Sequence, residues 1–63
     1  MKYKVYDECH TIGYFKTIND CIEALVKWNE DEKIREIIKD IDMTKDYIEI
    51  ETDDNLCYIE RIR

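Results

Sequence analysis

Residues 18–41 read INDCIEALVKWNEDEKIREIIKDI, and they contain two apolar stripes with the spacing of an α-helix. In each stripe the apolar residues recur three, four and seven positions apart, which places them on one face of a helix. The first stripe comprises Ile18, Cys21, Ile22, Leu25 and Val26, and the second comprises Ile34, Ile37, Ile38 and Ile41. The spacing therefore predicts two amphipathic helices joined by a short polar connection.

A polar residue marks the start of the first helix. Thr17 directly precedes the first stripe, and Asp20 follows it three residues later. This is a variant of the capping box with Asp in place of Glu, in which the threonine hydroxyl accepts a hydrogen bond from a free N–H of the first turn. We therefore expect the first helix to run from Thr17 to about Trp28.

The start of the second helix is less sharply marked. Either Asn29 with Glu32 or Asp31 alone can act as its cap. Acidic residues in a first turn also favour the positive end of the helix dipole. We expect this helix to cover residues 31–41, with both cap alternatives open.

Segments that alternate apolar and polar residues flank the two helices. Alternation with a period of two predicts β-strands, and the polar clusters at residues 7–10 and 53–55 predict the turns of two hairpins. The segments expected to be strands are residues 1–6, 11–16, 47–51 and 56–62. Both helices can bury their stripes on one face of a sheet. We predict a single α+β domain over residues 1–63, a two-layer sandwich in the order β-β-α-α-β-β with two helices on one face of a four-stranded, mostly antiparallel sheet.

The same alternation divides the strand residues between two faces of the sheet. The face toward the helices is expected to carry Tyr3, Val5, Phe15, Ile48, Ile50, Cys57 and Ile59, with Met1 in the same alternation. The opposite face is expected to carry Lys2, Lys4, Tyr6, Ile12, Tyr14, Tyr47, Glu49, Glu51, Tyr58 and Ile62. The second strand is the weak point, because a bulge near Gly13 would move Ile12 and Tyr14 to the other face.

Aromatic residues are unusually frequent on this opposite face. Four tyrosines stand there among charged residues, and aromatic side chains are enriched in binding hot spots. Scattered exposed apolar residues are also ordinary on protein surfaces, and that interpretation stays open. If the face is a contact surface, the residues expected to bind a partner are Tyr6, Tyr14, Tyr47, Tyr58, Glu49 and Glu51.

Trp28 lies beside the first stripe, where we expect it to fill the gap between the helices, or alternatively to be an exposed contact residue.

Charge is unevenly distributed along the chain. The net charge is −6, and residues 1–16 contribute three lysines against two acidic groups. The rest of the chain is therefore acidic, which disfavours nucleic acid as a partner because phosphates need clustered positive charge. The run Glu30, Asp31, Glu32 either imitates a nucleic-acid backbone toward a basic protein surface or simply keeps a small protein solvated.

The sequence gives little support for catalysis or metal binding. Its three cysteines, Cys9, Cys21 and Cys57, have no paired spacing, which favours reduced thiols. Cys9 and His10 are adjacent, yet neighbours in sequence need not point the same way, and no CxxC or HxxxH pattern accompanies them. One glycine excludes a glycine-rich phosphate loop. We expect no enzyme activity, no catalytic residue, no cofactor and no metal.

We expect a small acidic protein-binding module that acts by occupying a surface of a larger protein, such as one with a basic nucleic-acid-binding surface, or a second copy of itself. Composition of this kind is similar in type to accessory proteins of bacteriophages, including inhibitors of host defence such as CRISPR nucleases, although no motif identifies a family. No run of about 18 apolar residues is present, so we expect a cytoplasmic protein without membrane contact. The alternatives are a structural homo-oligomer and a single-strand nucleic-acid binder that uses Lys2, Lys4, Lys16, Tyr6 and Tyr14.

Overall fold

The computed structural model describes residues 2–62, so the expected position of Met1 lies outside the described residues. The elements follow the predicted order and confirm the α+β arrangement of two hairpins around two helices. Their bounds are β1 (Lys2–Asp7), β2 (Thr11–Phe15), α1 (Ile18–Asn29), α2 (Ile34–Ile37), the 3₁₀ turn η1 (Ile38–Asp40), β3 (Tyr47–Glu51) and β4 (Leu56–Ile62).

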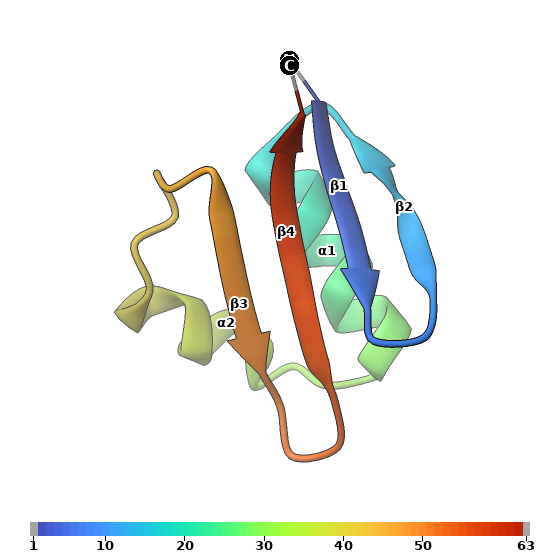
Figure 1. Cartoon of the computed structure of the whole chain (residues 1–63). Coiled ribbons are helices and arrows are strands. Elements are labelled where there is room, and N and C mark those ends of the chain that lie inside the picture. Colours follow the sequence, from blue (N-terminus) through green and yellow to red (C-terminus); the bar gives the residue numbers. More distant parts are fainter. Residues whose placement is uncertain (1, 63) are drawn as a thin grey trace.

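The four strands form one antiparallel sheet in the order β2-β1-β4-β3. The first and last strands are therefore the central pair, with Lys2 opposite Ile62 and Asp7 opposite Cys57. Figure 1 looks onto one face of this sheet, and both helices lie behind it. The face turned to the viewer is uncovered, and we call it the outer face.

The hydrophobic core lies between the sheet and the helices. The inward set predicted from strand alternation is confirmed, with Phe15 partly rather than fully buried. Both helical stripes contribute: Cys21, Ile22, Leu25, Val26 and Ile34 are buried, whereas Ile18, Ile37, Ile38 and Ile41 pack partly buried around them. Burial of one stripe per helix against one sheet face is the arrangement that the periodicity predicted.

The first helix begins as the sequence predicts. The Thr17 hydroxyl accepts a hydrogen bond from the Asp20 N–H at 3.1 Å. The helix continues one residue beyond Trp28 to Asn29. Glu30 then adopts a left-handed conformation, with φ 51°, and its N–H bonds to carbonyls of the last turn. This closes the helix with a non-glycine residue in a position that usually favours glycine.

The second helix is shorter than the predicted range 31–41. The Ile34 N–H bonds to the Asp31 carbonyl, and the Ile41 N–H bonds to the Ile38 carbonyl. Both bonds reach back three residues rather than four, which is the pattern of a tighter 3₁₀ coil. Side chains three apart align in such a coil, so the isoleucines still face the core, although only residues Ile34–Ile37 of this second segment are α-helical.

Neither predicted cap of the second helix acts as a helix N-cap. Asp31 accepts a hydrogen bond from the Lys33 N–H at 2.9 Å, which closes the turn ahead of α2. Lys33 is the residue directly before the helix, and its side chain makes no capping hydrogen bond. Asn29 belongs to the end of α1, and its side chain turns toward the sheet.

The bulge predicted near Gly13 is present, and it places Ile12 differently from the regular alternation. Val5 pairs with Gly13, but Tyr6 pairs with Thr11, so Ile12 is the extra residue on β2. A bulged residue interrupts the alternation of faces. Ile12 packs against the core, and its expected place on the outer face is therefore wrong.

Gly13 leaves room for the aromatic ring of Phe15 to lie over strand β2. A Cβ atom at this position would lie 2.9 Å from Cζ of Phe15, closer than ordinary van der Waals contact. The absence of a side chain thus lets the Phe15 ring cover the strand. Tyr14 stays on the outer face, opposite Lys4.

Substitution of Ile34 tests the importance of the short second helix. Ile34 is fully buried, so Ile34→Ala should lower the free energy of unfolding by about 2–5 kcal/mol, a large share of the stability of so small a domain. Ile41→Ala removes the same atoms from a partly buried position and should cost clearly less. Urea denaturation followed by Trp28 fluorescence measures both. Equal losses would show that α2 is not anchored in the core as described.

Candidate binding surface

Cross-strand pairing aligns the side chains of the outer face in rows that run across the sheet. One row, read from β2 to β3, comprises Tyr14, Lys4, Glu60 and Tyr47. The next row comprises Thr11, Tyr6, Tyr58 and Glu49. Directly paired residues of an antiparallel sheet place their side chains on the same face. All four tyrosines predicted for this face are therefore brought together on it.

Three of these tyrosines form a continuous stack, which we call the tyrosine stack: Tyr6, Tyr58 and Tyr47. The ring centroids of Tyr6 and Tyr58 are 5.0 Å apart with an interplanar angle of 25°. Those of Tyr58 and Tyr47 are 5.8 Å apart at 23°. Offset stacking at such distances stabilises aromatic pairs beyond the area that they bury. The stack therefore holds three large side chains in fixed orientations on an uncovered surface.

Polar contacts hold one end of the tyrosine stack. The Tyr6 hydroxyl donates a hydrogen bond to Oε1 of Glu60 at 2.9 Å. The ammonium nitrogen of Lys4 lies 4.9 Å from the Tyr6 ring centroid, within the range of a cation–π contact. Three contacts therefore hold the Tyr6 side chain in place: the hydrogen bond of its hydroxyl, the lysine over its ring and the stacked ring of Tyr58.

The hydroxyls of the tyrosine stack stay protonated under physiological conditions. Burial, reinforced by the hydrogen bond to Glu60, raises the pKa of Tyr6 to about 12. Burial and the nearby carboxylate of Glu49 also raise the pKa values of Tyr47 and Tyr58. The Tyr6 hydroxyl already donates to Glu60, and because the tyrosine stack is neutral, the formal charges of the outer face come from its lysine and glutamate residues.

The two margins of the outer face are the most exposed. Tyr14 on edge strand β2 is 55% exposed, and Tyr47 on edge strand β3 is 47% exposed. Both are large aromatic side chains, which a partner would cover with substantial burial of apolar area. The face thus has partly buried rings at its centre and open rings at both edges.

Charge divides the outer face into two halves. Lys2 and Lys4 lie on β1, whereas Glu60 lies on β4 and Glu49 and Glu51 lie on β3. Of the residues expected to bind single-stranded nucleic acid in the alternative interpretation, Lys2, Lys4, Tyr6 and Tyr14 share this face. The adjoining carboxylates would repel phosphates at the same place.

The predicted acidic run lies on a different surface. Glu30, Asp31 and Glu32 occupy the connection between α1 and α2, in the layer behind the sheet in Figure 1. Asp31 is engaged in its local turn, and Glu32 bonds to the guanidinium of Arg35 at 3.3 Å. The structure therefore separates the expected partner-binding residues into two groups that no single flat contact can cover.

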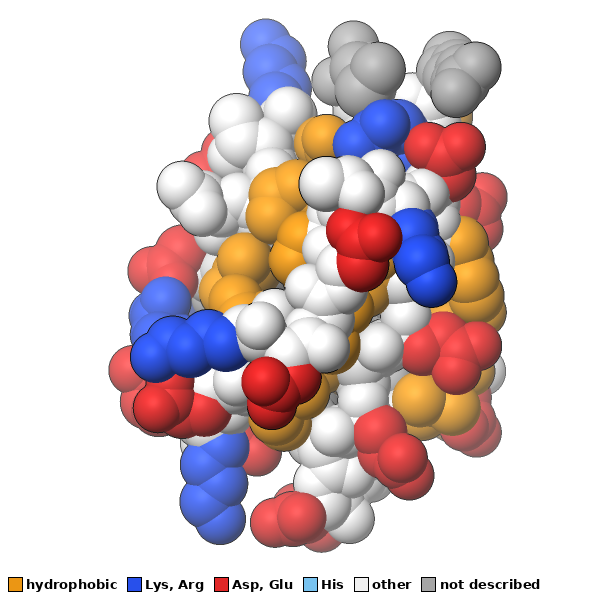
Figure 2. All heavy atoms as spheres, turned by 90° about the vertical axis from the view of Figure 1, so that its left-hand side faces the viewer, with side chains coloured by type: hydrophobic (Ala, Val, Ile, Leu, Met, Phe, Trp, Pro, Cys, Tyr) orange, Lys and Arg blue, Asp and Glu red, His pale blue; other side chains and the backbone are white. Residues whose placement is uncertain are grey.

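Basic residues interrupt the acidic field on the helix side. Arg35 also pairs with Glu23 on α1. Other exposed ion pairs join Lys39 to Glu36 and Lys33 to Asp53. Figure 2 looks from the left-hand side of Figure 1 and shows acidic and basic side chains interspersed, with hydrophobic side chains between them. This mixed pattern is typical of a solvated surface rather than of a row of phosphate-like charges.

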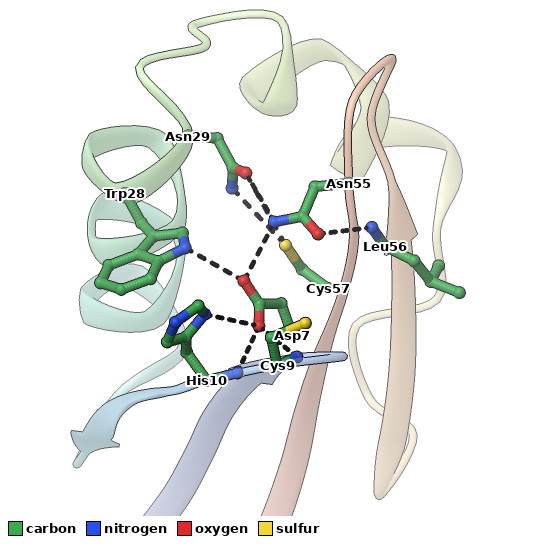
Figure 3. A network of polar contacts seen from close by, with 8 residues as sticks. All are labelled: Asp7, Cys9, His10, Trp28, Asn29, Asn55, Leu56 and Cys57. Carbon is green, nitrogen blue, oxygen red and sulfur yellow. Dashed lines mark hydrogen bonds and ion pairs between the residues drawn. The ribbon is translucent and has the colours of Figure 1, made fainter.

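Trp28 does not fill the gap between the helices, contrary to prediction. Its indole N–H donates to Oδ2 of Asp7 at 3.2 Å, and its ring lies 5.6 Å from that of His10. The indole thus packs toward the turn of the first hairpin, as Figure 3 shows. Its N–H satisfies a carboxylate on β1 instead of facing solvent, although the side chain stays 46% exposed.

Asp7 is the centre of a polar network that the sequence did not reveal (Figure 3). Its Oδ1 accepts hydrogen bonds from the backbone N–H groups of Cys9 and His10, at 2.8 and 2.6 Å. Its Oδ2 accepts hydrogen bonds from Trp28 and from the side-chain amide of Asn55 at 3.2 Å. The network therefore joins the turns of both hairpins to the end of α1.

The network continues from Asn55 into the core. The Asn55 amide also donates to the side-chain oxygen of Asn29 at 3.1 Å, and the Asn29 amide donates to the Leu25 carbonyl and the sulfur of Cys57. These residues are up to 48 positions apart. The sequence marks these residues only as members of separate turns, caps and stripes, and nothing in their local patterns indicates that they meet.

The Asp7 carboxylate is kept ionised. Burial opposes its charge, but the hydrogen bonds from Cys9, Asn55, His10 and Trp28 outweigh burial and lower the pKa of Asp7 to about 2. A carboxylate this acidic and this fully bonded is a poor proton acceptor near neutral pH. The group thus ties structural elements together, and Cys9 enters the network through its backbone N–H.

Within residues 2–62, no group of three or more histidine, cysteine, aspartate or glutamate side chains is arranged to hold a metal ion. None of the helices described is long and apolar enough to cross a bilayer. Cys21 and Cys57 are buried and Cys9 is exposed, and all three thiols are free.

Comparison of the chain with protein-family models, with curated proteins and with solved structures gave no match. No relative therefore assigns a role to any residue. Among the described residues, the outer face carries an ordered cluster of three stacked tyrosines.

The low pKa of Asp7 predicts acid-sensitive stability. Because this pKa lies below its ordinary value of 3.8, the carboxylate contributes stability above about pH 4, and that contribution is lost as the pH falls toward 2. Asp7→Asn should therefore lower the free energy of unfolding by about 2 kcal/mol at pH 7, with a gap that narrows toward pH 2. Urea titrations at pH 7, 5, 3 and 2 measure it.

Asp54→Asn is the control for this experiment, because Asp54 is an exposed residue of the second hairpin turn. Its stability should follow that of the unmodified chain across the pH series. A constant gap between Asp7→Asn and the unmodified chain would contradict an ionised, stabilising Asp7.

Proposed function

We propose that this chain is a non-catalytic protein-binding module whose contact surface is the outer face of the sheet. The observation that carries this proposal is the tyrosine stack, Tyr6, Tyr58 and Tyr47, held in order on a face that no helix covers. The Asp7 carboxylate, by contrast, is fully engaged in hydrogen bonds within the chain.

Ordered aromatic side chains support binding because they lower its entropic cost. A partner must usually immobilise the side chains that it contacts, at a cost of about 0.5–1.5 kcal/mol for each flexible one. Stacking and the hydrogen bond to Glu60 already restrict the rings of the tyrosine stack. Their contact area is thus available to a partner with little further ordering.

The dimensions of the molecule are also compatible with a specific interface. The chain measures 30 × 25 × 16 Å, and the thin direction is expected for one sheet and one helix layer. A standard interface buries about 800 Å² on each partner. A face bounded by the two longer dimensions can supply an area of that order, so one flat contact would occupy most of it.

A module of this kind acts by covering a surface rather than by chemistry. Its neutral hydroxyls and its separate basic and acidic halves offer directional contacts that select a partner. In the inhibitory mode, the chain would block the functional surface of a larger protein, such as a defence enzyme or a nucleic-acid-handling protein.

Removal of the tyrosine stack tests this proposal. Tagged chain is incubated with lysate of a bacterium that also produces an untagged copy of the chain, and the captured proteins are quantified by mass spectrometry. The Tyr47→Ser, Tyr58→Ser double variant should recover specific proteins at least about tenfold less well, because loss of a hot-spot aromatic costs about 2 kcal/mol or more.

The control carries Lys27→Ser and Lys39→Ser, which change exposed residues of the helix layer. It should recover the same proteins as the unmodified chain. Trp28 lies on the helix side, so its fluorescence reports folding of every variant independently of the outer face. If the tyrosine variant is folded and recovers the same proteins in the same amounts, the outer face is not the contact surface.

A further inference from the structure

The two central rows of the outer face are complementary to themselves. Read from β2 to β3, the first row runs Tyr14, Lys4, Glu60, Tyr47. When the reversed row is laid over the forward row, each tyrosine faces a tyrosine and the lysine faces the glutamate. A surface that matches its own reversal is the requirement for an isologous contact between two identical chains.

We propose that the occupant of the outer face is a second copy of this chain, related by a two-fold axis that runs parallel to the strands between β1 and β4. This inference rests on the proposed function, since it names the partner of the same face. The rotation lays the β2 edge of one copy over the β3 edge of the other. It therefore brings Lys4 over the partner's Glu60, and Glu60 over the partner's Lys4.

The second row fits the same axis. Tyr6 and Tyr58 occupy the two central strands at directly paired positions. The rotation brings Tyr6 over the partner's Tyr58 and places Thr11 near the partner's Glu49. Aromatic rings would thus meet between the central strands, and the adjoining row would place two opposite-charge pairs across the same axis.

Charge selects this axis over the other face-to-face arrangement. An axis perpendicular to the strands would lay each strand over the same strand of the second copy. Glu49 and Glu51 of β3 would then approach their own equivalents, and Lys2 and Lys4 of β1 would do the same. Like charges placed opposite one another disfavour association, so the parallel axis is the complementary solution.

The geometry of packed sheets suits the proposed contact. Two facing sheets lie about 10 Å apart with strand directions within about 30°, so the central strands stay in register while the corners diverge. Lys4, Tyr6, Tyr58 and Glu60 all lie on the central strands β1 and β4. Association also adds apolar burial to a chain of 63 residues, a length at which a single core gives little stability.

Charge exchange between two variants tests the proposed axis. Lys4→Glu places carboxylates at positions 4 and 60 of one chain, and Glu60→Lys places ammonium groups at both positions of another. Each variant alone would oppose like charges twice across the axis, and its dimer affinity should fall at least tenfold. An equimolar mixture pairs opposite charges on both sides of the axis and should dimerise again. Sedimentation equilibrium at low salt measures all three samples.

Two further variants control the experiment. Lys27→Glu makes the same charge change on α1 and should dimerise like the unmodified chain. The Lys4→Glu, Glu60→Lys double variant restores both opposite-charge pairs within a homodimer and should recover affinity even if one single variant folds poorly. Circular dichroism and Trp28 fluorescence verify folding in every case.

The results separate this inference from the proposed function. A monomeric unmodified chain at millimolar concentration, or a mixture that associates no better than the single variants, would overturn the two-fold dimer. Tyrosine-dependent capture of a larger protein without the untagged copy would also overturn it, while it supports the proposed function. We expect the mixture of the two charge variants to restore dimerisation. We also expect the tagged chain to capture the untagged copy, and the tyrosine variant to lose this capture.

Discussion

Antiparallel pairing between β1 and β4 joins the first and last strands of the chain at the centre of the sheet. This pairing places Val5 beside Ile59 in the core and Tyr6 beside Tyr58 on the outer face. It also brings Asp7, at the end of β1, next to the hairpin turn that carries Asn55. The core, the tyrosine stack and the polar network therefore all depend on pairing between residues that are 50 to 60 positions apart in the sequence. Closing so long a loop costs conformational entropy, which the packing must offset.

Coverage of only one sheet face follows from the small number of helical residues. Each helix has one apolar stripe, and both stripes are used against the inner face. Within residues 2–62, both helical segments lie on the inner side, so the tyrosines of the outer face stay uncovered.

The Asp7 network joins the turns of both hairpins to the end of α1. A buried carboxylate is costly unless donors satisfy it, and here backbone, indole and amide groups do so. Trp28 and Asn29 from α1 meet Asn55 from the second hairpin turn at this point. The network thus fixes the helix against both hairpins and keeps the strands in the register on which the rows of the outer face depend.

Local periodicity in the sequence determined the helices, the strands, the inner face and the Thr17 cap, because each follows from spacing over a few residues. It also placed the four tyrosines on one face, since alternation along each strand needs no knowledge of strand order. Tertiary structure decided the order β2-β1-β4-β3, the inward position of Ile12, the short second helix and the bonds of Trp28 and Asp7. These features depend on which distant segments come into contact, and such contacts do not produce a periodic pattern in the sequence.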